Sequence, residues 1–93
     1  MIIGRVIDEM VSTHKGEYFH GQKLLLVQPL DLQENDMDEA VLAIDGADAG
    51  IGDRVLLVQD GFAAMHVLGR FQVPVDAAVI GVIDQIDLFD RQG

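Results

Sequence analysis

The chain has 93 residues, which is the length of one domain with one hydrophobic core. Sixteen acidic against six basic residues give a formal net charge of -10, which opposes binding to a phosphate backbone. The chain contains no cysteine, which excludes disulfides and thiolate zinc sites and fits a reducing cytosol, and its apolar runs are far shorter than the roughly 20 residues of a membrane span. We therefore expect one domain over residues 1–93, with no secretory signal, no nucleic-acid partner and no membrane partner.

The N-terminal segment, residues 1–13, is mostly β-branched and predicts the first strand. Several of its apolar residues also fit a helical spacing, but Gly4 disfavours a helix interior. The imperfect alternation of polar and apolar side chains indicates a bulge near Asp8 and Glu9. A loop is expected over residues 14–21.

The next segment, residues 23–30, is a short apolar run, typical of a strand that is buried on both faces by a barrel wall or a subunit interface. Pro29 marks the end of this strand or an edge position, because proline cannot donate to a ladder. Residues 32–39 are polar and acidic and predict a solvated excursion. A third strand is expected over residues 40–45.

The second half of the chain begins with a glycine-rich connector, residues 46–53, which predicts a tight loop before a fourth strand at 54–60. Residues 62–68 contain helix-forming alanines and precede Gly69, so they predict one short helix. Pro74 is expected to open a brief turn, and the β-branched residues 78–86 predict the last strand.

This pattern predicts a mainly β fold: a small five-stranded OB-like β-barrel with one short α-helix. The chain is too small for a normal two-sheet sandwich, and closure removes the edges that five strands would otherwise expose. A small OB-like ligand-binding module is the alternative function for such a barrel. The ligand faces of OB barrels need aromatic platforms and cationic grooves, and this acidic chain has only 5% aromatic residues.

Residues that could carry catalysis are sparse. Ser12 is the only serine and no nucleophile elbow is present, so the sequence does not support a nucleophilic triad. The histidines His14, His20 and His66 lack the spacing of a metal motif. The acidic stretch at 34–39 lacks the central glycine of a calcium loop. We therefore expect no enzyme, no catalytic residue, no metal site and no cofactor.

Four segments, in order along nearly the whole chain, carry a resemblance to a known family. They are Ile-Gly-Arg-Val at 3–6, Gly-Gln-Lys-Leu-Leu-Leu-Val-Gln-Pro-Leu at 21–30, Ala-Gly-Ile-Gly-Asp at 49–53 and Pro-Val-Asp-Ala-Ala-Val-Ile-Gly-Val-Ile-Asp at 74–84. This sequence resembles the EutN/CcmL family of bacterial microcompartment shell vertex proteins.

The resemblance implies a structural role. It implies a five-stranded barrel that forms a homopentamer, caps the five-fold vertices of a polyhedral shell and provides the curvature for closure. The partners that it implies are other copies of the chain and the hexameric and trimeric shell proteins. The location that it implies is the shell of a microcompartment in the bacterial cytoplasm.

A cyclic ring brings identical loops together at its axis and joins neighbours through two different patches on each copy. The candidate pore loop consists of Asp48, Ala49, Gly50, Ile51 and Gly52. Asp48 stands where the family often has glycine, and it would add a ring of carboxylates at the axis. An ordinary turn between strands remains the alternative for this loop. The candidate subunit interface consists of Lys23, Leu25, Val27 and Pro29.

Overall fold

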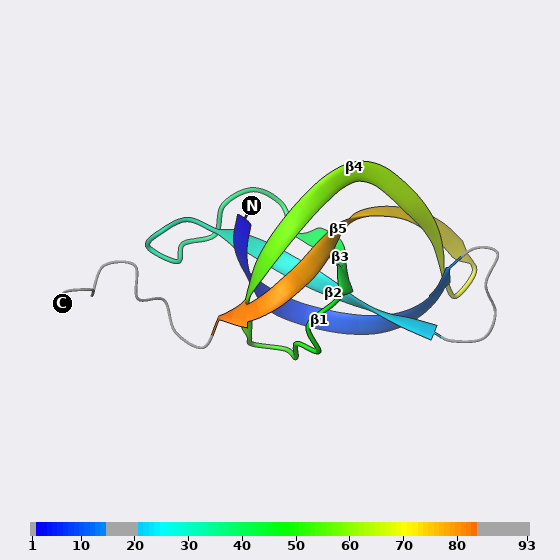
Figure 1. Ribbon diagram of the computed structural model, residues 1–93, viewed down its shortest axis with the longest axis horizontal. Coiled ribbons are helices and arrows are strands. Elements are labelled where there is room, and N and C mark those ends of the chain that lie inside the picture. Colours follow the sequence, from blue (N-terminus) through cyan, green and yellow to red (C-terminus); the bar gives the residue numbers. More distant parts are fainter. Residues whose placement is uncertain (1, 15–20, 84–93) are drawn as a thin grey trace.

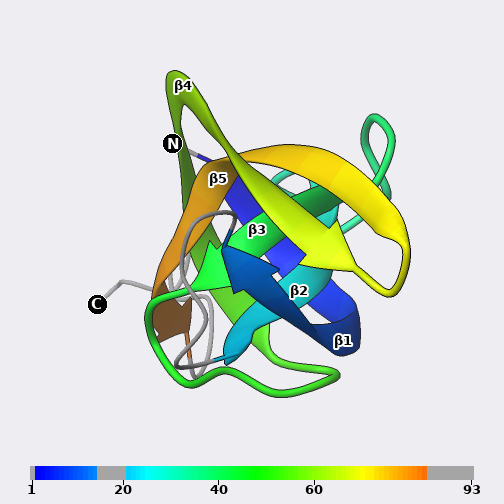
Figure 2. The same cartoon turned by 90° about the vertical axis from the view of Figure 1, so that its right-hand side faces the viewer.

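The computed structural model describes residues 2–14 and 21–83, and in these ranges it contains five strands and no helix. The strands are β1 (Ile2–His14), β2 (Gly21–Leu30), β3 (Val41–Asp45), β4 (Arg54–Leu68) and β5 (Phe71–Ile83). They close into a barrel in the order β1-β2-β3-β5-β4, with β4 pairing back to β1 (Figures 1 and 2). The predicted β-barrel is therefore confirmed. In the described ranges no helix has the length and apolar character to cross a membrane.

The barrel combines three antiparallel and two parallel strand pairs. The antiparallel pairs are β1 with β2, β2 with β3, and β4 with β5. The parallel pairs, β1 with β4 and β3 with β5, complete the closed barrel. Closure gives most strand edges a partner, which a chain with so small a core needs in order to avoid exposed backbone groups.

β1 contains the predicted bulge. Its register against β2 shifts between Val6 and Asp8, and the side chain of Ile7 between them is exposed. A bulge inserts one extra residue and bends the strand. β1 therefore curves along the floor of the barrel in Figure 1.

The predicted helix at 62–68 is wrong, because these residues form the second half of β4. Ala64 pairs with Val75 of β5, and the ladder continues to Leu68, which pairs with Phe71. Gly69, which we expected to stop a helix, has a φ of +62° and opens the two-residue turn between these strands. Glycine at the first position of such a turn is typical of a type II′ hairpin.

The turn expected at Pro74 is also wrong, because β5 already begins at Phe71 and Pro74 pairs with Met65 inside the ladder. Proline is tolerated there because, in the described part of the chain, β3 pairs with β5 only at Ala78 and Val79. The last strand was expected at 78–86, and its final three residues lie outside the described ranges.

The core inside the barrel is built from small and medium aliphatic side chains. The buried residues of this core are Val6, Leu25, Val27, Ala43, Ala49, Val55, Leu57, Ala77 and Val79. Leu24, next to Leu25, is also fully buried, so both faces of β2 are covered at this point within one chain. The predicted burial on both faces is therefore confirmed at Leu24 and Leu25, whereas Leu26 is only partly buried.

Candidate functional site

The loop at residues 46–53, between β3 and β4, is the predicted pore loop together with its flanks, and its backbone is held from both ends. The Gly46 amide donates a hydrogen bond to the Val79 carbonyl oxygen of β5 at 2.9 Å. The Gly52 amide donates to the Val6 carbonyl oxygen of β1 at 2.8 Å. These bonds fix the loop to two strands that the sequence does not connect to it directly.

The base of the loop is organised by a buried carboxylate. The Asp45 side chain is only 2% exposed. It accepts hydrogen bonds from the Ala47 amide at 3.0 Å and from the Ala49 amide at 3.1 Å. The Lys23 ammonium lies 3.2 Å from Asp45 Oδ2 and compensates the buried charge.

Lys23 joins the loop to two other strands. Besides Asp45 of β3, its ammonium nitrogen lies 3.5 Å from Glu9 Oε1 of β1 and 3.8 Å from Asp48 Oδ1 of the loop. We call Lys23, Glu9, Asp45 and Asp48 the Lys23 cluster. One cation on β2 thus ties β1, β3 and the loop together, a role that the sequence did not indicate for Lys23.

The cluster shifts the pKa values of its two inner members. Burial by itself would raise the pKa of Asp45, but the amides of Ala47 and Ala49 and the Lys23 ammonium outweigh it, so the pKa of Asp45 is lowered. The hydrogen bond to Asp45 outweighs desolvation and raises the pKa of Lys23. Both shifts favour the charged forms of the pair.

Stability is therefore expected to depend on pH through Asp45. Its folded pKa lies below the unfolded value of 3.8, so its contribution is complete above that pH and disappears as the pH falls through the folded pKa. Urea unfolding between pH 7 and pH 3 is expected to show a steeper acid loss in the native chain than in Asp45→Asn. An equally steep acid loss in both proteins would contradict this role. Lys23, with a raised pKa, contributes below 10.5 and loses its contribution only in strong alkali.

The five predicted pore residues differ in exposure. Asp48 is fully exposed and Ile51 is 60% exposed, whereas Ala49 is buried in the barrel core. Asp48 adopts a left-handed φ of +56°, and Gly52 has a φ of +94°. A left-handed backbone favours glycine, which explains why glycine suits the position of Asp48. The Gly50 amide is bound by the Asp53 carboxylate at 2.8 Å.

The four predicted interface residues lie mostly inside the barrel. Leu25 and Val27 are fully buried in the core, and Pro29 is buried as well. Their side chains face the interior, so in this chain Leu25 and Val27 have no surface to offer a neighbouring subunit. Only Lys23 is partly exposed, and its ammonium belongs to the Lys23 cluster.

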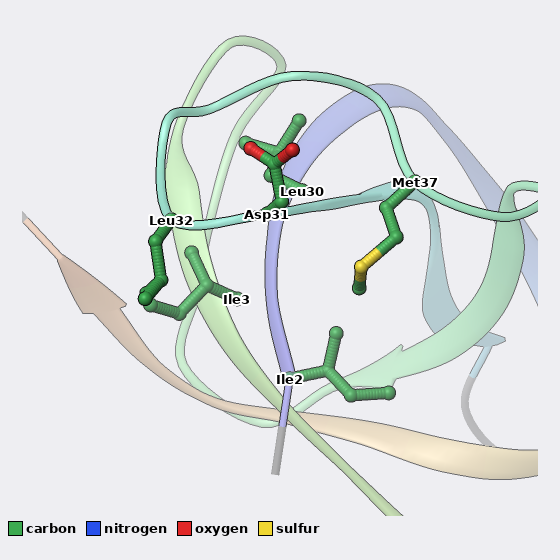
Figure 3. A pocket seen from close by; sticks show the side chains of 6 residues that line it. All are labelled: Ile2, Ile3, Leu30, Asp31, Leu32 and Met37. Atoms are coloured by element: carbon green, nitrogen blue, oxygen red, sulfur yellow. The ribbon is translucent and has the colours of Figure 1, made fainter.

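An apolar pocket that we did not predict lies at the start of β1. It has a volume of about 320 Å³ and is lined by Ile2, Ile3, Leu30, Asp31, Leu32 and Met37. Figure 3 shows aliphatic side chains and the Met37 thioether around one opening. The one polar side chain of the lining, the Asp31 carboxylate, accepts hydrogen bonds from the Gln33 and Asn35 amides, both at 2.9 Å. We call this hollow the end pocket.

Two arginines stand beside the end pocket. Arg5 of β1 and Arg54 of β4 are direct strand partners. Arg5 lies 3.5 Å from Asp36, and Arg54 lies 2.8 Å from Glu34. Both acids belong to the excursion between β2 and β3 that also supplies Leu32 and Met37 to the pocket, so apolar and cationic groups are adjacent here.

The one serine of the chain lies beside a histidine, but both side chains are buried. Ser12 Oγ lies 3.2 Å from His66 Nδ1, but Ser12 is 2% exposed and His66 is fully buried, so a substrate cannot reach this pair. Within residues 2–14 and 21–83, no three acidic or histidine side chains gather in a way that could hold a metal ion.

Comparison with known proteins gives relatives over nearly the whole chain. Residues 1–84 match the family described as ethanolamine utilisation protein EutN/carboxysome. The carboxysome shell vertex protein CcmL of Nostoc sp. is 40% identical, covering 98% of this chain and 90% of the relative. The bacterial microcompartment shell vertex protein PduN of Salmonella typhimurium is 34% identical, covering 92% of this chain and 98% of the relative.

The fold agrees with a solved member of the same group. The structure of Gloeobacter violaceus CcmL superimposes with a TM-score of 0.70 at 34% identity, covering 98% of this chain and 93% of that one. These relatives are named for a position in a protein shell and not for a reaction. The chain therefore belongs to the EutN/CcmL family of structural shell vertex proteins.

Proposed function

We propose that the chain forms a homopentamer that caps the five-fold vertices of a bacterial microcompartment shell. The observation that carries the proposal is the similarity, over more than nine tenths of the chain, to relatives named as shell vertex proteins of several kinds of compartment. The closed barrel with its buried aliphatic core supports a structural role.

The proposed mechanism is geometric. A flat layer of six-fold units cannot close on itself, and a five-fold unit at selected points introduces the curvature at which facets meet. The partners are therefore other copies of the chain together with hexameric and trimeric shell proteins. Each copy contacts its two ring neighbours through different patches, since a cyclic ring uses head-to-tail contacts that stop growing when the rotation closes.

We further propose that the loop at 46–53 lines the axis of the ring. Its exposed tip carries Asp48 and Ile51, and its backbone is fixed by the bonds of Gly46 and Gly52, so five copies would present the same rigid surface. Five Asp48 carboxylates around one opening would repel anions and attract cations.

The test of the axial loop compares two exposed acids. Asp48→Asn and Glu39→Gln each remove one negative charge per chain, and both side chains lie at the surface. In sealed shells, Asp48→Asn is expected to raise the rate at which a small anion enters, because the carboxylates that repel it are gone. Glu39→Gln is expected to leave this rate unchanged. Equal entry rates in both variants would exclude the axial position.

The test of capping is co-expression with a hexameric shell protein, followed by electron microscopy of the particles. With the chain present, closed particles with sharp corners are expected. Without it, the same shells are expected to remain open at their corners. Equally sealed particles in both samples would exclude capping, and a monomer that binds a small molecule or an oligonucleotide would favour the OB-like ligand-binding module.

A further inference from the structure

The end pocket is an exposed, mainly apolar hollow. Leu32 on its wall is 56% exposed and Met37 is 39% exposed. A buried cavity of about 150 Å³ accepts benzene, so the end pocket, at about 320 Å³, has room for more than one aliphatic or aromatic side chain. Exposed apolar surface next to polar groups is typical of an interaction site.

The chain itself contains a segment that matches this pocket in chemistry. Residues 84–93 follow β5 and read Asp-Gln-Ile-Asp-Leu-Phe-Asp-Arg-Gln-Gly. In an extended segment Ile86 and Leu88 share one face, and Phe89 follows directly. Such a segment presents two or three apolar side chains within a span of about 10 Å, which suits a single small pocket.

Charge favours the same match. Asp84, Asp87 and Asp90 alternate with the apolar residues of this segment. Beside the pocket, Arg5 and Arg54 are adjacent cations whose present partners, Asp36 and Glu34, are at least 40% exposed. Exposed ion pairs of this kind contribute little and exchange readily, so the two guanidinium groups can accept further carboxylates.

We infer that residues 84–90 of one copy bind the end pocket of the next copy in the ring, with Leu88 and Phe89 in the pocket and the flanking aspartates on Arg5 and Arg54. This inference rests on the proposed ring. A head-to-tail ring needs two complementary patches on every chain, and the C-terminal segment and the end pocket form such a pair.

Because the chain has no cysteine, an engineered disulfide tests the contact without background. Met37→Cys and Phe89→Cys are made in separate chains, mixed, assembled and oxidised. A covalent dimer is expected from this mixture. The matched control pairs Phe89→Cys with Ala63→Cys, an exposed position of β4 outside the pocket lining, and is expected to give at least tenfold less dimer. Leu32→Cys replaces Met37→Cys if the latter does not fold.

A second variant measures the contribution of the contact. Changing Leu88 and Phe89 together to serine is expected to raise the concentration needed for ring assembly about tenfold or more, since hydrophobic anchors dominate binding. Changing Gln85 and Gln92 together to serine is the control and leaves assembly unchanged.

Three outcomes overturn the inference. Native mass spectrometry of the reduced chains distinguishes a failure of this contact from a failure of the ring. A pentamer without the covalent dimer excludes this contact and leaves the proposed function intact. A chain carrying both cysteines that closes only an internal disulfide places the segment on its own barrel. A reduced, unmodified chain that stays monomeric removes the ring on which the inference depends.

Discussion

Replacing Asp45 by alanine is expected to lower the free energy of unfolding by about 3 kcal/mol, because it leaves two backbone amides and one ammonium group without their acceptor. The lost acceptor serves the amides of Ala47 and Ala49 and the ammonium of Lys23. The loop at 46–53 is then held mainly by its backbone bonds to β1 and β5. Urea denaturation measures the loss, and faster amide hydrogen exchange at Ala47 and Ala49 is expected to accompany it.

The control for this change is Asp53→Ala in the same loop. The Asp53 carboxylate accepts one hydrogen bond, from the Gly50 amide, and its residue is only half-buried. Its removal is expected to cost about 1 kcal/mol. Losses of equal size in the two variants would show that Asp45 does not organise the base of the loop.

Gly4→Ala is the second change with a large expected effect, a loss of about 2–3 kcal/mol in the free energy of unfolding. Gly4 is buried in β1, where it pairs with Pro29 of β2. An added Cβ would clash with Val27 Cγ1 and lie 2.9 Å from the Gln28 carbonyl oxygen. The carbonyl belongs to the neighbouring strand, so β1 and β2 would have to separate. Thermal unfolding followed by circular dichroism measures the effect.

Gly81→Ala in β5 is the matched control, because it makes the same chemical change in a strand of the same barrel. A Cβ at Gly81 would meet no atom within 4 Å. This variant is expected to be as stable as the native chain or more stable by about 0.5 kcal/mol, since alanine reduces the freedom of the unfolded chain. If both variants unfold at the same temperature, close packing at Gly4 is not the reason for glycine there.

Local patterns were sufficient for most strands and for the bulge. A β-branched segment predicted β1, and short apolar runs bounded by glycine, proline and acidic residues predicted β2, β3 and the beginning of β4. Imperfect alternation predicted a bulge near Asp8 and Glu9, and the register shift lies between Val6 and Asp8. These features depend on neighbours along the chain, which a sequence pattern records directly.

The end of β4 shows where local patterns fail. Residues 62–68 combine alanines, Met65 and Leu68, which have good helical propensity, yet their backbone groups pair with β5. Gly69 supplies a positive φ that ends a helix and opens a hairpin equally well. The choice between a helix and a strand depends on pairing with β5, and local propensity does not predict this long-range pairing.

The candidate site was predictable only in part, for the same reason. The loop at 46–53 was recognisable from its glycines, but the Lys23 cluster depends on the register that places Lys23 of β2 near Asp45 of β3 and Glu9 of β1. The end pocket depends on the pairing of Ile3 with Leu30, residues far apart in the sequence. The apolar character of residues 23–30 suggested a subunit interface at Leu25, whereas the side chain of Leu25 lies in the barrel core.

Native mass spectrometry of the unmodified chain tests whether this barrel builds a five-fold unit. A single dominant species at five times the chain mass of 10.1 kDa is expected, stable over dilution into the micromolar range. A dominant monomer, hexamer or open series of oligomers would contradict the proposal that identical barrels meet through a rotation of one fifth of a circle.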